Sequence, residues 1–381
     1  MIKRIWTGHR ALAIVLLAIA VVAFLVSSLL LVNSTHGTSQ ASATPGTTDS
    51  PFPSPSDTPM PFLSPTPTIN TGPTPLPAGM AYSDLDGVAA TTDLAHRLPL
   101  AIMVDDNKVA RPQSGISSAS IVYQAPADGG EDRYMMVFQE GTAKDIGPVR
   151  SARPYYVYWA AEYKALFGHF GGDRQSRKVT IPAMANNIYN MDALNGGGCP
   201  YRRVSTRPAP HNAYTNSANL IGCAAARKYP ATYQKLPTRP FRDDTAAGLL
   251  PAAQSISIFY KTGTVGYKFN PTTDSYMRLI GGAPEIDPAN GQQVYARSII
   301  VMDQFNTNDY SEPGHVRPDV HNVGSGPVMV FQEGKVIKGT WKKKNNTALT
   351  RFYDSSGKEI SLVRGEIFIQ SRPPQYKVTI S

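Results

Sequence analysis

Two arginines, Arg150 and Arg153, stand immediately before a segment whose spacing predicts a helix. Pro154 suits the first helical position, where its missing N–H costs nothing. One helical face then follows through Tyr155, Tyr158, Trp159, Tyr163 and Leu166. Because a helix start carries positive partial charge, it repels both guanidiniums. The pattern therefore predicts a negative partner, which is either a bound anion or an internal carboxylate such as Asp105, Asp106, Glu131 or Asp132. Ser151, between the arginines, is interpreted as the helix cap.

Side chains that bind carboxylates, phosphates and sugar faces are concentrated around this turn. Arginine forms paired hydrogen bonds to anions, and tyrosine combines a flat apolar face with a polar tip. The hypothesis is an anion site in which Arg150 and Arg153 form a central clamp, helped by nearby tyrosines. The predicted ligand-binding residues are Arg111, Arg150, Ser151, Arg153, Arg203, Arg207, His211 and Asn212. The alternative is that these are scattered surface and scaffold residues.

The sequence supports acid–base catalysis less strongly than anion binding. The candidate catalytic residues are His169, His211 and Asp173, because two histidines and a carboxylate that converge could transfer protons or bind zinc. No histidine pair has a metal-ligand spacing such as H-x-x-x-H, so we expect no metal site and no cofactor. The alternative is that backbone carbonyls hold these histidines. The run Asp319-Val320-His321-Asn322 is a further polar feature that precedes a Gly-Ser-Gly turn.

The chain has two cysteines, Cys199 and Cys223. In an oxidising compartment they are candidates for a disulfide worth roughly 3 kcal/mol, although two free thiols remain an alternative. Gly196-Gly197-Gly198-Cys199 also suggests the nucleophile of a cysteine transpeptidase. A reactive thiol needs an electropositive and unpaired setting, however, which the sequence does not indicate.

The charge balance argues against nucleic acid as a partner. The 381 residues hold 37 Lys+Arg and 28 Asp+Glu, a formal net charge of +9. Lys3, Arg4 and Arg10 precede an apolar run, which leaves a modest and dispersed +6 for the remainder.

Residues 11–32 form an apolar run long enough to cross the ~30 Å hydrocarbon core of a bilayer. Since the basic residues precede it, residues 1–10 are predicted to be a cytoplasmic tail, and everything after the span is predicted to be exported. The expected location is the plasma membrane, with a single pass and the folded domains outside. A cleaved signal peptide is the alternative, because Ala41-Ser42-Ala43 resembles a cleavage site. No cysteine follows the run closely, which excludes a lipid-modified anchor.

Residues 33–84 are rich in Pro, Ser and Thr and contain few large apolar side chains. Such a sequence buries too little surface to offset its ordering entropy, so we predict a disordered, extended linker.

The remaining chain is predicted to be α+β (mixed), with an N-terminal α/β part at 98–245 and a β-rich C-terminal part at 255–376. Apolar runs predict buried strands such as 100–104, 121–123 and 134–138 in the first part. A second helix is predicted at 216–229, with Thr215 or Asn216 as its cap. The second part shows mostly strands, among them 256–260, 265–269, 276–280, 294–302, 328–331, 336–341 and 367–369.

Several separated motifs occur in an order that resembles the YerB-like family, bacterial envelope proteins built from a domain of unknown function with N- and C-terminal parts. They are Ala110–Gly115, Ile146–Tyr155, Gly168–Gly172, Val323–Gly326, Gly339–Lys342 and Thr350–Asp354. The resemblance implies an extracytoplasmic location and a two-part architecture, and it implies no reaction. Many relatives look like lipoproteins, whereas this chain lacks the lipid-bearing cysteine.

These observations predict a membrane-anchored extracytoplasmic protein that binds an anionic cell-envelope ligand or acts as an envelope scaffold. Its expected partners are the lipid bilayer, through residues 11–32, and a cell-wall polymer or envelope protein. The alternative is a hydrolase or transferase acting on peptidoglycan or a wall polymer.

Overall fold

The computed structural model describes residues 74–194, 199, 201–233, 235–244, 253–312 and 314–381. The predicted span at 11–32 and most of the predicted linker lie outside these residues. Among the helices that the structure describes, none combines the length and apolar character needed to cross a membrane. The description below concerns the compact unit that contains all of these residues.

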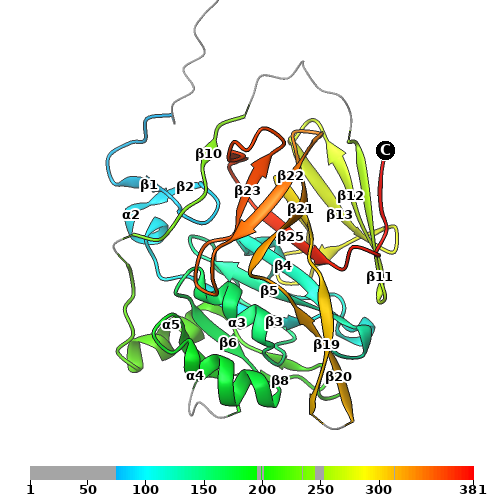
Figure 1. The fold of residues 1–381 in the computed structure, drawn as a ribbon. Coiled ribbons are helices and arrows are strands. Elements are labelled where there is room, and N and C mark those ends of the chain that lie inside the picture. Colours follow the sequence, from blue (N-terminus) through cyan, green and yellow to red (C-terminus); the bar gives the residue numbers. More distant parts are fainter. Residues whose placement is uncertain (1–73, 195–198, 200, 234, 245–252, 313) are drawn as a thin grey trace, which may run out of the picture. The chain divides into compact units, whose positions relative to one another are not determined.

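One ten-stranded sheet unites the two parts of the chain that the sequence suggested (Figure 1). In spatial order its strands are β23 (Arg351–Asp354), β22 (Lys335–Lys343), β21 (Gly324–Gln332), β18 (Ser298–Asp303), β25 (Ile367–Arg372), β4 (Ile121–Pro126), β5 (Asp132–Phe138), β3 (Leu100–Asp105), β6 (Leu166–His169) and β7 (Tyr189–Asp192). The two parts join where β25 pairs with β4 in parallel, Ile367 opposite Ile121. The N-terminal and C-terminal parts are therefore halves of one sheet.

Both faces of this sheet are buried, as alternation along β3 illustrates. Successive side chains of a strand point to opposite faces. Ala101 and Met103 pack into one core together with the aromatic residues of the helix that follows β5. Leu100, Ile102 and Val104 pack into a second core on the other face. Because both faces are covered, the central strands are continuous apolar runs, which explains why the sequence revealed them so clearly.

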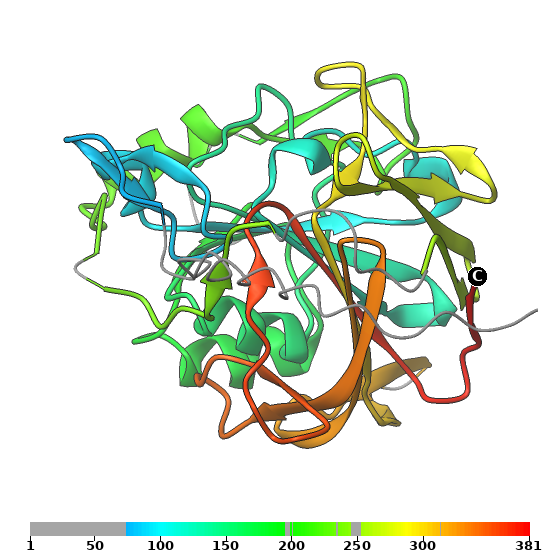
Figure 2. The ribbon, with the colours of Figure 1, turned by 90° about the horizontal axis from the view of Figure 1, so that it is seen from above.

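A six-stranded sheet covers part of the second face. It consists of β14 (Ala283–Pro284), β13 (Ser275–Ile280), β12 (Gly263–Asn270), β11 (Ser255–Tyr260) and β26 (Val378–Ile380), with β17 (Tyr295–Ala296) beside β13. In Figures 1 and 2 its yellow strands lie on the side of the molecule away from α3. Five two-stranded pairs complete the strands: β1 (Met80–Tyr82) with β2 (Ala89–Thr91), β8 (Arg202–Arg203) with β9 (Ala213–Tyr214), β10 (Phe241–Arg242) with β24 (Leu362–Val363), β15 (Ile286–Asp287) with β16 (Gln292–Gln293), and β19 (Asn306–Glu312) with β20 (His315–Val320).

The helices are short, and the two longest pack against opposite faces of the large sheet. They are α2 (Thr92–Ala95), α3 (Pro154–Ala161), α4 (Ile181–Ala183) and α5 (Ser217–Ala226). Helix α3 begins at the predicted proline and contributes Tyr155, Tyr156 and Trp159 to the first core. Helix α5 contributes Leu220 to the second core and is capped by Asn216, whose side chain accepts a hydrogen bond from the Asn219 N–H. The predicted cap of α5 is therefore confirmed.

Two predicted boundaries were wrong. The expected linker, 33–84, extends too far, because Met80–Tyr82 forms β1 and the buried Leu85 joins the first core. The expected C-terminal part, 255–376, stops too early, because Val378–Ile380 pairs with β11. Both segments are short, and their pairing partners lie elsewhere in the chain, so composition alone did not distinguish them from loops.

A buried carboxyl group, Asp132, lies at the start of β5 and accepts a hydrogen bond from the Thr262 hydroxyl. Burial, followed by the charge of Asp106, raises the pKa of Asp132 to about 8. This carboxyl group is thus protonated in the folded protein at a pH where the unfolded chain ionises it, near its ordinary pKa of about 4. Its contribution to stability is complete below pH 4 and is lost as the pH rises through 8.

We therefore expect Asp132 to lower the free energy of unfolding between pH 4 and pH 8, by at most about 1.4 kcal/mol per pH unit for its single proton. Asp132→Asn should remove this contribution and make the pH profile less steep. Urea unfolding at pH 5, 7 and 8.5 measures it. The control is Asp93→Asn, which removes an exposed carboxylate of α2. Parallel pH profiles for Asp132→Asn and the unaltered protein would contradict the assignment.

Candidate anion-binding site

Two adjacent buried carboxylates, Asp105 and Asp106, mark the end of β3. The Asp105 carboxylate accepts a hydrogen bond from His211 Nδ1 at 2.6 Å and lies 3.1 Å from Arg150 Nε. Asp106 accepts from Arg111 Nε at 2.8 Å and from the side-chain amides of Gln113 and Gln124. The two carboxylates have different partners, because neighbouring residues of a strand point to opposite faces.

The backbone around Arg150 runs alongside the end of β3. The Arg150 N–H donates to the Met103 carbonyl at 2.9 Å, and the Asp105 N–H donates to the Pro148 carbonyl at 2.9 Å. The Val149 N–H donates to the Ala213 carbonyl at 2.6 Å, which brings the loop that carries His211 to the same place. Segments far apart in the sequence thus place Arg150 and His211 on one carboxylate.

Two more arginines complete this group, and neither pairs with a carboxylate of the described residues. Arg207 donates to the carbonyls of Ala110 and Pro112, on either side of Arg111. Arg203 donates to the side-chain oxygen of Asn212 at 2.5 Å, and its guanidinium lies 4.5 Å from the centre of the Phe170 ring. The side chains of Arg111, Arg150, Arg203, Arg207 and His211 are called the arginine–histidine cluster below.

The arginine–histidine cluster has an excess of positive charge. Within the described residues, the ion pairs of its four arginines involve two carboxylates, Asp105 and Asp106, which leaves a formal charge of +2 with the histidine neutral. Burial opposes the charge of Arg111, but Asp106 outweighs that effect and raises the pKa of Arg111. Arg150 is 20 % exposed, and its terminal nitrogens make no hydrogen bond within the described residues. Arg150 can therefore accept an additional anion without breaking an existing contact.

Arg153 belongs to a different group, centred on Asp128. Its guanidinium forms a two-pronged ion pair with the Asp128 carboxylate and lies 3.6 Å from Asp173. Arg133 and Arg317 also approach Asp128, at 3.7 and 3.5 Å. Although burial alone would raise the pKa of Asp128, these arginines, Arg153 above all, lower it to about 2. Burial and the charges of Arg153 and Arg150 lower the pKa of the enclosed Arg133 to about 10.

The structure does not bring Arg150 and Arg153 together as one clamp, because Arg153 is buried and turned toward Asp128. The negative partners that the helix start demanded are internal: Asp105 for Arg150, as one alternative proposed, and Asp128 with Asp173 for Arg153. The interpretation of Ser151 as the helix cap is wrong. Its hydroxyl donates to the Phe170 carbonyl at 3.0 Å, and the cap position belongs to Arg153.

The expected tyrosine lining is largely absent from this site. Tyr155, Tyr156 and Tyr214 are buried, and Tyr201 donates to the Met191 carbonyl. Tyr158 lines a separate pocket described below. Asn212 is also occupied, since it accepts from Arg203 and donates to the Val204 carbonyl at 3.0 Å.

The histidines do not form a joint site in the structure. His169 is fully buried, and its two ring nitrogens lie 2.7 Å from the Gly171 carbonyl oxygen and 2.7 Å from the Asn190 side-chain oxygen. These contacts fit the alternative in which the protein itself satisfies the histidine. Asp173 accepts from the Ser176 N–H at 2.5 Å and lies near Arg153. Of the three candidate catalytic residues, His211 alone belongs to the arginine–histidine cluster.

A carboxylate group elsewhere has the shape of a cation site. Asp244, Asp274 and Glu333 offer oxygen atoms within 4.8 Å of one another. Arg297 lies 2.5 Å from Asp244 and 2.9 Å from Asp274, and Arg242 lies 2.6 Å from Glu333. The guanidiniums already neutralise these carboxylates, so we assign no metal to them.

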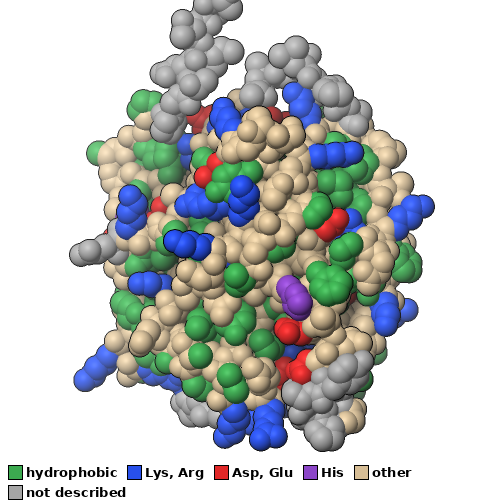
Figure 3. All heavy atoms as spheres, in the orientation of Figure 1, with side chains coloured by type: hydrophobic (Ala, Val, Ile, Leu, Met, Phe, Trp, Pro, Cys, Tyr) green, Lys and Arg blue, Asp and Glu red, His purple; other side chains and the backbone are tan. Residues whose placement is uncertain are grey.

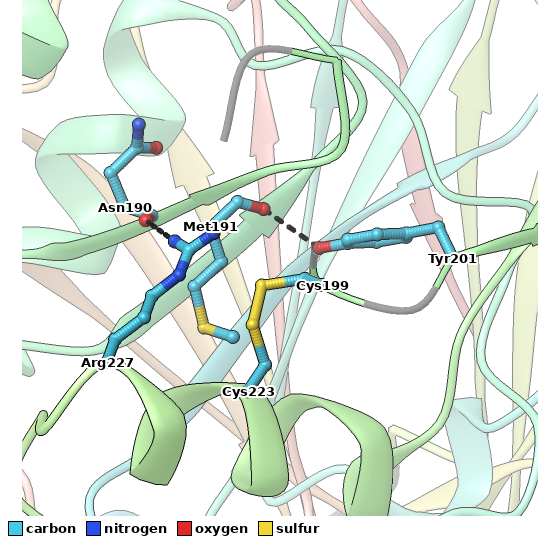
Figure 4. The surroundings of a disulfide bond; sticks show 6 residues. All are labelled: Asn190, Met191, Cys199, Tyr201, Cys223 and Arg227. Carbon is cyan, nitrogen blue, oxygen red and sulfur yellow. Dashed lines mark hydrogen bonds between the residues drawn. A yellow bond between two sulfur atoms is a disulfide. The ribbon is translucent and has the colours of Figure 1, made fainter. Parts of the chain in front are cut away.

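Cys199 and Cys223 form a disulfide in the structure (Figure 4). It ties helix α5 to the segment that follows β7, next to two further contacts: Tyr201 donates to the Met191 carbonyl, and Arg227 donates to the Asn190 carbonyl at 3.0 Å. Disulfides persist in oxidising compartments, so this bond agrees with an exported domain.

The disulfide closes a loop between residues 24 apart in the sequence. In the chain-entropy account such a bond restricts the unfolded state, and we expect Cys199→Ser/Cys223→Ser to lower the free energy of unfolding by about 3 kcal/mol. Guanidinium unfolding of the oxidised protein, the reduced protein and the double variant measures this. The reduced protein and the variant should agree, and an unchanged midpoint for both would contradict the prediction.

Sequence comparison places the chain in a family. Residues 85–230 match the N-terminal domain described as "Protein of unknown function (DUF3048)", and residues 256–369 match the C-terminal domain of the same description. The chain therefore belongs to the DUF3048 family, as the YerB-like motifs predicted.

Within this family it is 28 % identical, over 303 residues, to the Bacillus subtilis (strain 168) protein named "Putative lipoprotein YerB". The alignment covers 78 % of this chain and 88 % of that protein. The crystal structure of YerB from Bacillus subtilis shares the fold, with a TM-score of 0.68 at 24 % identity over 78 % of this chain and 99 % of the other.

Sequence reasoning missed Asp128 and Arg317, which surround Arg153. The sequence Asp128-Gly129-Gly130 could have identified Asp128, because an aspartate before two glycines indicates a tight turn that can expose the aspartate carboxylate to a partner. Arg317 lies in a polar hairpin with no apolar alternation, so no local signal identified it.

Proposed function

We propose that this chain is a membrane-anchored extracytoplasmic protein that binds an anionic cell-envelope ligand through its arginine–histidine cluster. Membership of a family that includes a Bacillus subtilis protein named as a lipoprotein supports a membrane-associated, exported location. Because this chain lacks a cysteine near its apolar run, we propose that residues 11–32 anchor it by a single pass with the N-terminus inside.

The uncompensated charge of the arginine–histidine cluster carries the ligand proposal. Within the described residues, Arg150 keeps its terminal nitrogens unbonded, and Arg203 and Arg207 use neutral acceptors. An anionic oxygen, carried by a phosphate or carboxylate of a wall polymer, can accept hydrogen bonds from these guanidiniums. Asp105 holds both Arg150 and His211 in place, so the binding groups need little rearrangement.

The test uses the full-length protein in detergent micelles, sedimented with purified cell-wall sacculi. One sample retains its anionic wall polymers, and the other has been stripped of them by acid. We expect the protein to bind the first sample and to lose binding as salt rises. Arg150→Ala and Arg203→Ala should each weaken binding about tenfold or more, the loss of one charged hydrogen bond.

The matched control is Arg351→Ala, which removes an arginine from β23 paired with Glu359 and far from the cluster in the sheet order. It should bind as the unaltered protein does. Equal binding to both kinds of sacculi, or unchanged binding by folded Arg150→Ala and Arg203→Ala proteins, would refute the proposal.

A second candidate, hydrolysis or group transfer on the wall, rests on the Asp105–His211 pair. A carboxylate only accepts, so His211 Nδ1 donates to it, and Nε2 remains available as a base. Incubation with sacculi, as described above, distinguishes catalysis from binding. Release of muropeptide fragments that His211→Gln abolishes would favour an enzyme, whereas sedimentation without release favours binding.

A further inference from the structure

A separate pocket of about 660 Å³ lies beside the β19–β20 hairpin and carries chemistry that the arginine–histidine cluster lacks. Its wall combines the start of α3, the segment after β6, the hairpin and the residues that follow it. The volume falls within the range of small-molecule sites, roughly 300–1,000 Å³. In Figure 3, acidic side chains and a histidine side chain lie together beside this hairpin.

The pocket wall is rich in hydrogen-bond acceptors. Asp173, Asp309 and Asp319 contribute carboxylates, and asparagines add amide oxygens. Asp173 already accepts from the Ser176 N–H and lies near Arg153, and Arg317 adds a guanidinium to the same wall. Ionised carboxylates accept and never donate. Asp319 is exposed, and its side chain makes no hydrogen bond or ion pair within the described residues. A matching ligand must therefore carry many donors.

Two further side chains favour a polyhydroxylated ligand over a simple cation. Tyr158 is half-buried at the pocket, although its neighbours Tyr155 and Tyr156 are buried, so its ring offers a flat apolar surface there. Asn322 is only 5 % exposed and lines the pocket, and its side-chain nitrogen makes no hydrogen bond within the described residues. A buried donor without a partner is costly, and a ligand oxygen would satisfy it. A simple ammonium ion offers no such acceptor.

We propose that this pocket is a saccharide-binding site. Hydroxyl groups of the sugar donate to Asp309 and Asp319 and accept from Asn322, while one sugar face packs on Tyr158. The run Asp319-Val320-His321-Asn322, conspicuous in the sequence, thereby contributes two of the ligand contacts. This site does not depend on the anion site, because it shares none of its residues.

Isothermal titration of the full-length protein in detergent tests this with defined probes: maltotetraose, chitotetraose and the glucosamine tetramer, with spermidine as a polyamine without hydroxyls. We expect saturable binding of at least one tetrasaccharide. Asp319→Asn should weaken it about tenfold, since a hydrogen bond to a charged group is lost. Asp93→Asn, which removes an exposed carboxylate of α2, and Arg150→Ala should leave the affinity unchanged.

Three results would overturn the proposal: no tetrasaccharide binding at millimolar concentration, binding of spermidine alone, or saccharide binding that a folded Asp319→Asn protein retains in full. Since Asp319 is exposed and unpaired within the described residues, its replacement should not affect folding, which the melting temperature checks. Loss of sacculus binding by Arg150→Ala with retained tetrasaccharide binding separates the two sites.

Discussion

Replacing Arg278 with methionine is expected to lower the free energy of unfolding by about 3–5 kcal/mol, because it leaves a buried carboxylate without its counter-charge. Arg278 lies on β13 and is fully buried between the two sheets. It donates to Glu285 at 2.5 Å, to the hydroxyls of Tyr267 and Tyr134, and to the Gln124 side chain at 2.9 Å. Its loss therefore removes one ion pair and several hydrogen bonds at once.

The chemistry of the Arg278 site depends on the planar guanidinium. Burial opposes its charge, but Tyr134, Tyr267 and Glu285 outweigh this effect and raise its pKa well above the ordinary value. The group also lies 4.9 Å from the centre of the Phe368 ring. The single ammonium group of lysine cannot replace the hydrogen bonds that the planar guanidinium donates in several directions. Arg278→Lys should therefore recover only part of the stability that Arg278→Met loses.

Guanidinium unfolding monitored by tyrosine and tryptophan fluorescence measures the effect. Arg351→Met is the control, because it removes a half-buried arginine whose partly exposed ion pair with Glu359 should contribute no more than about 1 kcal/mol. A loss below about 1 kcal/mol for Arg278→Met would show that the sheets do not depend on this contact. A single cooperative transition in the unaltered protein is also expected, since both sheets share Arg278.

The failure to predict the shared sheet has a physical cause. The hydrophobic runs at 121–123 and 367–369 predicted buried strands. Such a run indicates that a strand is buried, but it does not indicate which strand lies beside it in the sheet. Ile121 and Ile367 face each other in a parallel pair across a large sequence separation. No turn geometry connects such partners, so the sequence suggested two separate parts where one sheet exists.

In the segment from Arg150 to Arg153, the sequence predicted the helix that follows but not the directions in which the two arginines point. The spacing after Pro154 predicted α3 and the need for negative charge at its start. Arg153 has extended backbone, with φ −134° and ψ 153°, and the chain from Val149 to Ala152 also forms bridges to β3 and to Gly172. Residues three apart in an extended segment point to opposite sides, so Arg150 and Arg153 diverge. The extended backbone of this segment, which the residue types alone did not predict, therefore places Arg150 in the arginine–histidine cluster and Arg153 beside Asp128.

Replacing Glu162 with glutamine is the second change expected to reduce stability by about 3–5 kcal/mol. Glu162 follows α3 and accepts from Lys343 Nζ on β22 at 2.6 Å, from the Thr350 N–H at 3.0 Å and from the Thr350 hydroxyl at 2.7 Å. Lys343 and Glu162 are both fully buried side chains. Glutamine keeps the shape but leaves the Lys343 ammonium in the core without a counter-charge.

The pH dependence of this loss separates electrostatics from packing. Burial lowers the pKa of Lys343, and Glu162 partly offsets that effect. A lysine whose folded pKa lies below its unfolded value destabilises the folded state while protonated, and this penalty disappears as the pH rises through the folded pKa and approaches the unfolded one. Without Glu162 the folded pKa falls further. The stability gap between Glu162→Gln and the unaltered protein should therefore shrink between pH 7 and pH 10.

Lys343→Met provides the matched comparison, because the two partners are not equivalent. Without Lys343, Glu162 still accepts from Thr350 and lies 3.6 Å from Arg239, which keeps a positive charge beside it. Without the Glu162 charge, the carbonyl acceptor that Lys343 retains among the described residues is that of Ala348. We therefore expect Glu162→Gln to be the more destabilising change in denaturant unfolding at pH 7. The opposite order, or a gap that does not change with pH, would mean that packing at the end of α3 outweighs the buried charge.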